Sequence, residues 1–198
     1  MKFAEQEKRD LLNAGLIISL AFAILLSGGY KILLVFEPKI FMAFIMAFFT
    51  AGLGFLLHEL MHKYVAQSYG FYAKFVAFYN MLWLSLLFSL FGFIFAAPGA
   101  VFIKGNINKE QNGKISLAGP LTNIILSVVF LMPILIFNLS GIAKSFFDFG
   151  LTINSLLAAF NMLPVTPFDG AKIIAWSKSI YFLTLIIAIV LFVSGMLL

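Results

Sequence analysis

The sequence contains no cysteine and very little charge. Without cysteine among its 198 residues, the chain can form neither a disulfide nor a thiolate metal site. Charged residues make up 11% of the chain and hydrophobic residues 63%, whereas a soluble domain is about a quarter charged and half apolar. The lysines and arginines are scattered and form no basic stripe, so nucleic acid is not an expected partner. The composition indicates an integral membrane protein embedded in a lipid bilayer.

Long apolar runs predict the membrane-spanning helices, each of which needs ~20 residues. We expect an all-α polytopic protein with a bundle of about five or six transmembrane helices. One membrane-embedded domain is expected over 1–198, with no soluble regulatory domain. The clearest apolar runs are 11–35, 40–66, 115–138, 150–169 and 179–198. A sixth run, 81–103, is interrupted by AAPGA at 96–100, where Pro98 removes a backbone donor.

Histidine is nearly absent as well, and both copies lie in one short stretch, FLLHELMHKY at 55–64. His58, Glu59 and His62 match the pattern H-E-x-x-H. On a helix, residues four apart share a face, so both imidazoles can reach one metal ion. Zinc accepts imidazole nitrogens, and a carboxylate beside it can remove a proton from water. Two buried histidines with local hydrogen bonds are the alternative, but ionisable groups inside a membrane are costly and usually functional.

A third zinc ligand has to be a carboxylate, because no other histidine or cysteine exists. The remaining acids are Glu5, Glu7, Asp10, Glu37, Glu110, Asp148 and Asp169. Asp169 stands alone at the end of an apolar run, in NMLPVTPFDG, where Pro164 and Pro167 stop a helix. Irregular backbone at membrane depth is tolerated where protein buries it or where it lines a watery cavity. From this segment alone, a helix that ends at the surface with a solvated Asp169 is an equal alternative.

A third motif, AGPLTN at 118–123, places Gly119 and Asn123 on one helix face. Small residues let helices approach closely, and a buried asparagine can hydrogen-bond across the contact. Helix packing is the simpler interpretation. The functional interpretation is a helix that packs beside the metal site and supports it.

The positive charges predict the orientation, because lysine and arginine collect in cytoplasmic loops. With a cytoplasmic N-terminus and no single crossing by 81–103, ten of the 13 lysines and arginines lie inside. The three outside are Lys31, Lys39 and Lys144. The histidines lie near the end of the run 40–66, and Asp169 lies at the end of the run 150–169. They can share a metal only if both runs cross the membrane in the same direction, with an odd number of crossings between them. Because 115–138 supplies one crossing, 81–103 must not add another. We therefore expect 81–103 to form a re-entrant segment or hairpin, with Pro98-Gly99 as its turn.

Together, the three motifs resemble the site-2 protease family of intramembrane zinc metalloproteases. The family pattern is H-E-x-x-H, then G-x-x-x-N/S/G, then N-x-x-P-x-x-P-x-D-G, and this chain matches all three in order over about 40–175. The resemblance implies that His58, His62 and Asp169 hold one Zn²⁺ per chain. It implies that Glu59 is the catalytic general base and that Asn161 supports substrate or the oxyanion.

The same resemblance implies further features of the site and its surroundings. A membrane-associated β-rich hairpin between the first and second core helices suits 71–104. The implied reaction is hydrolysis of a peptide bond within or near the transmembrane segment of a membrane protein substrate. A chain this short suggests a prokaryotic cell membrane, with the N-terminus and zinc site toward the cytoplasm. The residues expected to shape the site without reacting are Gly119, Asn123, Pro164, Pro167 and Gly170.

Two other functions compete with this interpretation. A prenyl-protein protease also carries H-E-x-x-H but takes a later glutamate as third ligand, and no glutamate follows Glu110. An inactive homologue, or a membrane metal-binding or transport protein, could use the same His/His/Asp site. The intact Glu59 argues against an inactive relative, because metal binding alone does not need it. Neither the substrate's identity nor the oligomeric state follows from the sequence.

Overall fold

The computed structural model describes residues 1–31, 39–94 and 98–198. The chain folds into two compact units, which are described separately below. The first unit comprises 1–56 and 74–102, and the second comprises 57–73 and 103–198. The chain passes from the first unit to the second within helix α4, Leu53–Ser68.

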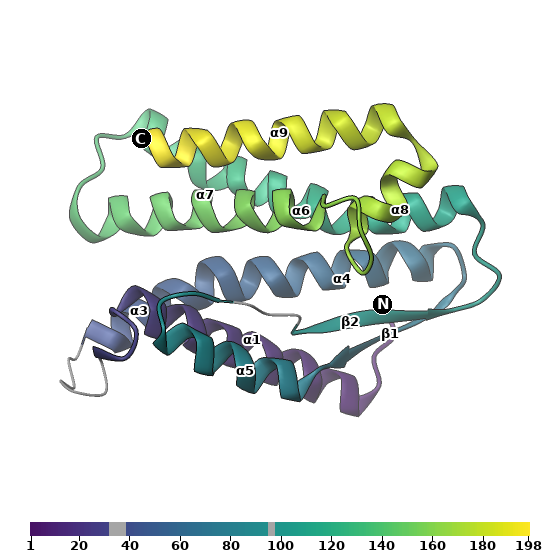
Figure 1. Cartoon of the computed structure of the whole chain (residues 1–198), viewed down its shortest axis with the longest axis horizontal. Coiled ribbons are helices and arrows are strands. Elements are labelled where there is room, and N and C mark those ends of the chain that lie inside the picture. Colours follow the sequence, from purple (N-terminus) through teal and green to yellow (C-terminus); the bar gives the residue numbers. More distant parts are fainter. Residues whose placement is uncertain (32–38, 95–97) are drawn as a thin grey trace. The chain divides into compact units, whose positions relative to one another are not determined.

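Helix α1, Glu5–Leu26, is the central element of the first unit. It packs against α3, Lys39–Ala47, against the π-helical turn η1, Phe48–Gly52, and against α5, Tyr79–Leu90 (Figure 1). Gly52 allows the close approach of η1, because a Cβ there would overlap the hydroxyl of Ser19 on α1. The buried apolar core of this unit consists of Ala14, Ile18, Phe55, Phe75, Ala77 and Leu82.

Strands β1, Tyr72–Ala77, and β2, Gly99–Lys104, form a two-stranded sheet. Two buried carboxylates of α1 support β1. Glu7 accepts a hydrogen bond from the Phe75 amide at 2.8 Å, and Asp10 accepts one from the Ala77 amide at 3.5 Å. These amides are two residues apart and so lie on the same edge of the strand. The two carboxylates of α1 thus accept the hydrogen bonds that the carbonyls of a neighbouring strand would accept at that edge of β1.

The apolar run 81–103 does not form one long helix among its described residues. Helix α5 has 12 residues and a length of roughly 18 Å, which is too short for a hydrocarbon core of about 30 Å. The expected β pairing near 71–104 is confirmed, but the expected turn at Pro98-Gly99 is wrong. Gly99 is the first residue of β2, and α5 occupies most of the connection between the strands. Positions 95–97, which include Ala96 and Ala97 of AAPGA, lie outside the described residues.

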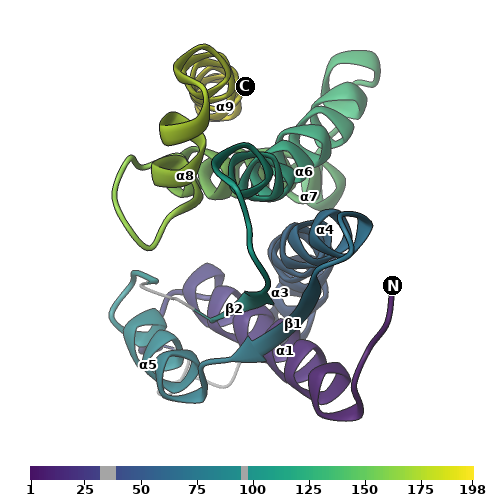
Figure 2. The same ribbon diagram turned by 90° about the vertical axis from the view of Figure 1, so that its right-hand side faces the viewer.

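The second unit contains four helices beside the C-terminal part of α4. They are α6, Lys109–Ile136, α7, Gly141–Asn161, α8, Asp169–Trp176, and α9, Lys178–Leu197. Helix α6 packs against α7 and α8, and α9 packs against α7 and α8 (Figure 2). One apolar core joins α6, α7 and α9 through Ile124, Phe130, Leu151, Ala158, Ala188 and Leu191. A smaller one around Met162, Ile173 and Tyr181 joins the end of α7 to α8 and α9.

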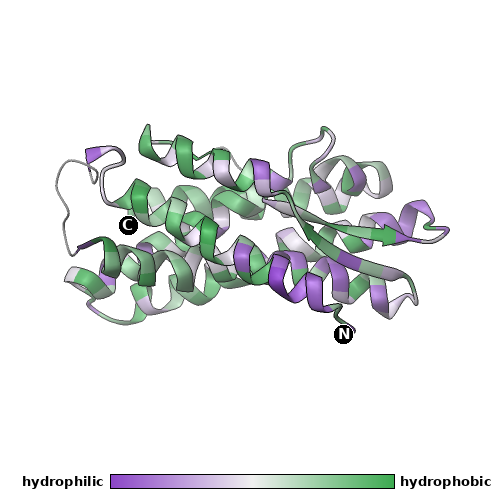
Figure 3. Cartoon of the chain, turned by 90° about the horizontal axis from the view of Figure 1, so that it is seen from below, coloured by the Kyte–Doolittle hydropathy of each residue, from purple (hydrophilic) through white to green (hydrophobic). Residues whose placement is uncertain are grey.

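Four described helical segments are long and apolar enough to cross a membrane. They are Glu5–Leu26, Lys39–Ser68, Lys109–Ile136 and Lys178–Leu197. Apolar residues cover most of their length in Figure 3, whereas the first turns of α1 are hydrophilic. The expected span at 150–169 is wrong in its bounds, because α7 begins at Gly141 and ends at Asn161. Its 21 residues are not among the four candidate spans, so the expected bundle of five or six stays a prediction.

Candidate metal centre

His58 and His62 lie one turn apart on α4, as their spacing predicts. Their side chains share one face of the helix, and both residues are buried, with 4% and 8% of their surface exposed. The two imidazole rings meet edge to face, with centroids 4.6 Å apart. Both rings therefore lie side by side on the same face of α4.

Asp169 approaches both histidines from α8, the short helix that follows α7. Helix α7 ends at Asn161, and the segment 162–168 with both prolines is not helical, so the chain returns before α8 begins at Asp169. Gly170 makes the return possible, because a Cβ there would overlap the backbone carbonyl of Met162. Asp169 is thus the first residue of a short helix and not the last residue of a span, which corrects the sequence prediction.

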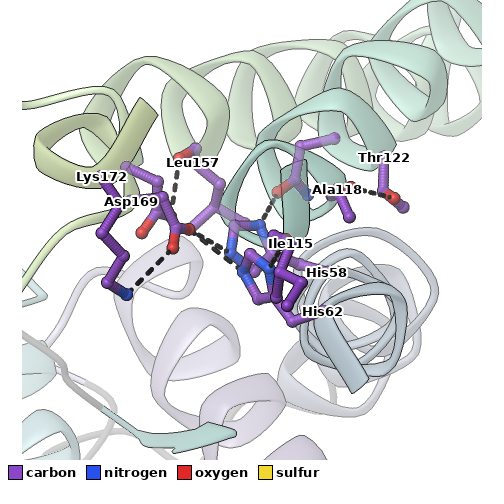
Figure 4. A network of polar contacts seen from close by, with 10 residues as sticks. His58, His62, Ile115, Ala118, Thr122, Leu157, Asp169 and Lys172 are labelled. Carbon is purple, nitrogen blue, oxygen red and sulfur yellow. Dashed lines mark hydrogen bonds and ion pairs between the residues drawn. The ribbon is translucent and has the colours of Figure 1, made fainter. Parts of the chain in front are cut away.

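The Asp169 carboxylate faces both histidines (Figure 4). Its Oδ2 atom lies 3.1 Å from Nε2 of His62 and 3.4 Å from Nε2 of His58. Its Oδ1 atom lies 3.6 Å from Nζ of Lys172, which comes from the first turn of α8. The structure therefore brings together the three residues that the sequence nominated as ligands, with one potential ligand atom of each within 4.8 Å of the others.

The second nitrogen of each imidazole fixes how the ring is protonated. Nδ1 of His62 lies 2.8 Å from the backbone carbonyl of Ile115, which can only accept, so Nδ1 carries the proton. Nδ1 of His58 lies 2.6 Å from Oδ1 of Asn123, which is also an acceptor. In a neutral imidazole ring, a proton on Nδ1 leaves Nε2 unprotonated, with a lone pair that can accept a hydrogen bond or bind a metal. Both Nε2 lone pairs are then directed toward the Asp169 carboxylate.

Three converging acceptors repel one another unless positive charge lies between them, as two protons or as one metal ion. Two imidazole nitrogens and one carboxylate form the ligand set of a catalytic zinc site that keeps an open position. Zinc ligands at ~2.0–2.1 Å in a tetrahedron lie roughly 3.3–3.4 Å apart. The distances of 3.1 and 3.4 Å from Asp169 to the histidines are close to that separation. The residues present thus fit zinc in both donor type and spacing.

Gly119 on α6 provides room at the same point. A Cβ at position 119 would come closer than 3.0 Å to Nε2 of both His58 and His62. Only a residue without a side chain leaves these nitrogens unobstructed. The expectation that α6 packs beside the histidine pair is confirmed in its geometry, and Asn123, one turn further along, contacts His58 directly.

Comparison with known proteins identifies relatives along nearly the whole chain. The sequence is 41% identical over 182 residues to "Putative zinc metalloprotease MJ0611" of Methanocaldococcus jannaschii, covering 91% of this chain and 89% of that protein. This chain belongs to the zinc metalloproteases. A second protein of that organism, "Zinc metalloprotease MJ0392", is 30% identical over 129 residues, which are 60% of this chain and 30% of that protein.

A bacterial relative is more distant. "Putative zinc metalloprotease YwhC" of Bacillus subtilis is 28% identical over 145 residues, which are 63% of this chain and 65% of that protein. No protein-family model matches the chain, and no solved structure matches it. Membership of the zinc metalloproteases thus depends on these relatives, and the His58, His62 and Asp169 cluster agrees with it.

Two further residues, Glu59 and Asn161, are expected to take part in catalysis. Glu59 follows His58 on α4 and is largely buried, with 9% of its surface exposed. Asn161 is the last residue of α7, and its amide donates to the Leu157 carbonyl of its own helix at 2.9 Å. The roles of Glu59 as base and of Asn161 as oxyanion support stay predictions.

Sequence reasoning missed one buried residue that is linked to the site, Asn154 on α7. It is completely buried and accepts a hydrogen bond from the side-chain amide of Asn123 at 3.0 Å. A signal was present, because Asn154 interrupts the apolar stretch GLTINSLLAAF, and polar residues within such helices commonly face a partner. Its partner could not be identified without the structure.

Proposed function

We propose that this metalloprotease is an intramembrane enzyme of the site-2 type, which hydrolyses a peptide bond in or near the transmembrane segment of a membrane protein. One observation carries the proposal. The histidine pair belongs to the apolar helical segment Lys39–Ser68, which is long enough to cross a bilayer, and Asp169 meets it there. A soluble metalloprotease has no need for such a segment around its ligands. The same site is proposed to hold one zinc ion per chain.

The proposed mechanism assigns a separate task to each residue. His58, His62 and Asp169 would hold the ion, which would act as a Lewis acid and make water nucleophilic near neutral pH. Glu59 takes the proton from the attacking water and returns it to the leaving amine. The surrounding helices exclude bulk water, so that these charges act in a medium of low dielectric. Asn161 is proposed to donate to the substrate carbonyl with the second N–H of its side-chain amide, whose first N–H bonds to the Leu157 carbonyl.

The proposed substrate is a transmembrane helix that opens locally before it is cut. A helix in lipid satisfies its backbone groups internally, so its carbonyls are not accessible to attack. Residues that weaken the helix near the cleavage position should therefore favour cleavage. The enzyme is proposed to be a multi-pass protein of a prokaryotic cell membrane, with its N-terminus and zinc site toward the cytoplasm, in agreement with the distribution of lysine and arginine.

The test compares zinc content and peptide cleavage in the purified protein. Wild type should contain zinc and cleave a model transmembrane substrate in detergent or proteoliposomes. Glu59→Gln should retain the zinc and lose roughly 10²–10⁴-fold in cleavage rate, because the general base is gone. Glu110→Gln is the matched control, since Glu110 is exposed and pairs only locally with Lys114.

Three results would contradict the proposal. Substrate cleavage that persists in Glu59→Gln would show that another group acts as the general base or that a contaminating protease cleaves the substrate. Zinc binding without cleavage of any transmembrane substrate, by a protein that does cleave soluble peptides, would place the enzyme in another class of zinc metalloprotease. Zinc binding with no cleavage at all would favour a metal-binding or transport protein.

A further inference from the structure

A line of buried amides connects the proposed metal site to a backbone carbonyl on α7. Nδ1 of His58 contacts Oδ1 of Asn123 at 2.6 Å, and Nδ2 of Asn123 donates to Oδ1 of Asn154 at 3.0 Å. Nδ2 of Asn154 donates to the carbonyl of Gly150 at 2.9 Å. His58 is 4% exposed, and both asparagines are fully buried. The line crosses three helices, from α4 through α6 to α7.

The end of this line determines its direction. A backbone carbonyl can only accept a hydrogen bond, so the amide group of Asn154 must direct its NH₂ toward Gly150. Its oxygen then faces Asn123 and accepts from the Asn123 NH₂. The oxygen of Asn123 in turn faces His58 and accepts the proton of Nδ1. Each orientation follows from the preceding one, and none of the three side chains can reverse alone without placing two donors or two acceptors together.

We infer that Asn154 is a positioning residue of the metal centre, which acts through Asn123 to hold His58 with its proton on Nδ1 and its Nε2 free for the metal. This inference depends on the proposed zinc site. Asn154 is linked to the proposed metal ligand His58 through Asn123. Its contribution is to hold the orientation of the Asn123 amide.

The expected loss of zinc affinity follows from the change in amide orientation that this line of hydrogen bonds prevents. Removal of the Asn154 oxygen takes away an acceptor that directs the Asn123 NH₂ away from His58. An Asn123 amide that turned over would present its NH₂ to Nδ1 of His58. That arrangement favours the opposite ring form, with the proton on Nε2, where it blocks the metal. Loss of an outer-shell partner of a metal ligand typically costs 10–100-fold in metal affinity. Asn154 is linked to His58 by way of the Asn123 side chain, so its removal should have a smaller effect than removal of Asn123. We expect zinc affinity to fall about tenfold.

The first arm of the test measures zinc affinity by competition with a chelator. Asn154→Leu has a similar volume and no hydrogen-bonding group, and Asn154→Ala serves as a second variant if the leucine disturbs folding. Either should bind zinc about tenfold more weakly. Ser155→Ala is the matched control, because Ser155 is equally buried on α7 and bonds only to Leu151 and Thr152 of its own helix. It should bind zinc as wild type does.

A double-mutant cycle distinguishes positioning from general destabilisation. If Asn154 acts through Asn123, its replacement should have little further effect on zinc affinity in an Asn123→Ala background. Additive losses would show that Asn154 affects zinc affinity independently of Asn123, and would overturn the inference. So would zinc affinity within about twofold of wild type in a folded Asn154 variant.

The second arm needs no variant, because the chain has only two histidines. Wild type labelled with ¹⁵N-histidine and freed of zinc has four ring nitrogens, whose NMR shifts report which of them carry protons. Near pH 8, where free imidazole is neutral, His58 should have its proton on Nδ1. A His58 ring without a proton on Nδ1 would overturn the inference even if every variant failed to fold. A wild type that binds no zinc would instead refute the proposed function.

Discussion

Gly119 of α6 lies directly against Nε2 of His62 on α4. A Cβ at position 119 would come closer than 3.0 Å to that nitrogen and to Nε2 of His58, which real Cβ atoms do not do. The atoms nearest to this glycine are thus the two nitrogens that are proposed to hold zinc. Here the absence of a side chain is a requirement of the site as well as of helix packing.

Gly119→Ala is therefore expected to abolish tight zinc binding. The added methyl group must displace both imidazoles, and the displaced nitrogens no longer converge with the Asp169 carboxylate. The measurement is the zinc-to-protein ratio after dialysis, together with chelator competition. Gly195→Ala is the control, because its Cβ would crowd Thr152 and Leu151 in the same unit without reaching the ligands. Full zinc occupancy in Gly119→Ala would show that the ion is held elsewhere.

Asp169→Asn tests whether the carboxylate is a ligand. The substitution preserves size and one oxygen but removes the negative charge that offsets a divalent cation. Zinc affinity should fall by more than the roughly 10–100-fold typical of outer-shell partners. Asp148→Asn is the control, because Asp148 pairs with Lys144 at 2.9 Å on α7 and has no contact with the histidines. Unchanged affinity in Asp169→Asn would exclude Asp169 from the coordination sphere.

The sequence indicated which three residues lie together, because the chemistry of zinc leaves few candidates in this chain. His58 and His62 are the only histidines, and helical geometry alone places them on one face. Asp169 was distinguished from the other acids by the prolines before it, which end α7 as predicted. The family resemblance then implied the same three residues, and the structure places them together.

The remaining features could not be predicted, because they depend on partners distant in the sequence. Glu7 and Asp10 belong to the charged N-terminal stretch MKFAEQEKRD, yet both are buried against β1, 68 and 67 residues further along the chain. Hydropathy also could not locate the start of α7, since Lys144 and Asp148 lower the apolarity of its first turns while they pair with each other. Helix surfaces that face lipid and those that face protein are both apolar, so the apolar pattern does not predict which of the two a residue contacts.

Glu7→Ala should destabilise the first unit. It leaves the buried Phe75 amide without its carboxylate acceptor, which costs about 1–3 kcal/mol. The thermal midpoint in detergent should fall, and hydrogen exchange at the Phe75 amide should accelerate. Glu7→Gln keeps a side-chain oxygen and should lose less. Glu5→Ala is the control, because Glu5 is exposed and pairs only with Lys8. Equal losses in Glu7→Ala and Glu7→Gln would show that the negative charge, and not the acceptor, stabilises β1.

The absence of cysteine makes the proposed topology directly testable, because each introduced cysteine is the only labelling site. Asn106→Cys and Ser140→Cys lie at exposed positions just before and just after α6, whose 28 residues extend roughly 42 Å and can cross a bilayer. With a cytoplasmic N-terminus and no full crossing between α4 and α6, a membrane-impermeant thiol reagent added outside intact cells should label the Ser140→Cys protein and leave the Asn106→Cys protein unlabelled. The reverse result, with only the Asn106→Cys protein labelled from outside, would mean that the 81–103 segment crosses once or that the chain is inverted. Labelling after cell lysis confirms that both sites are reactive, so that protection reflects the membrane and not burial.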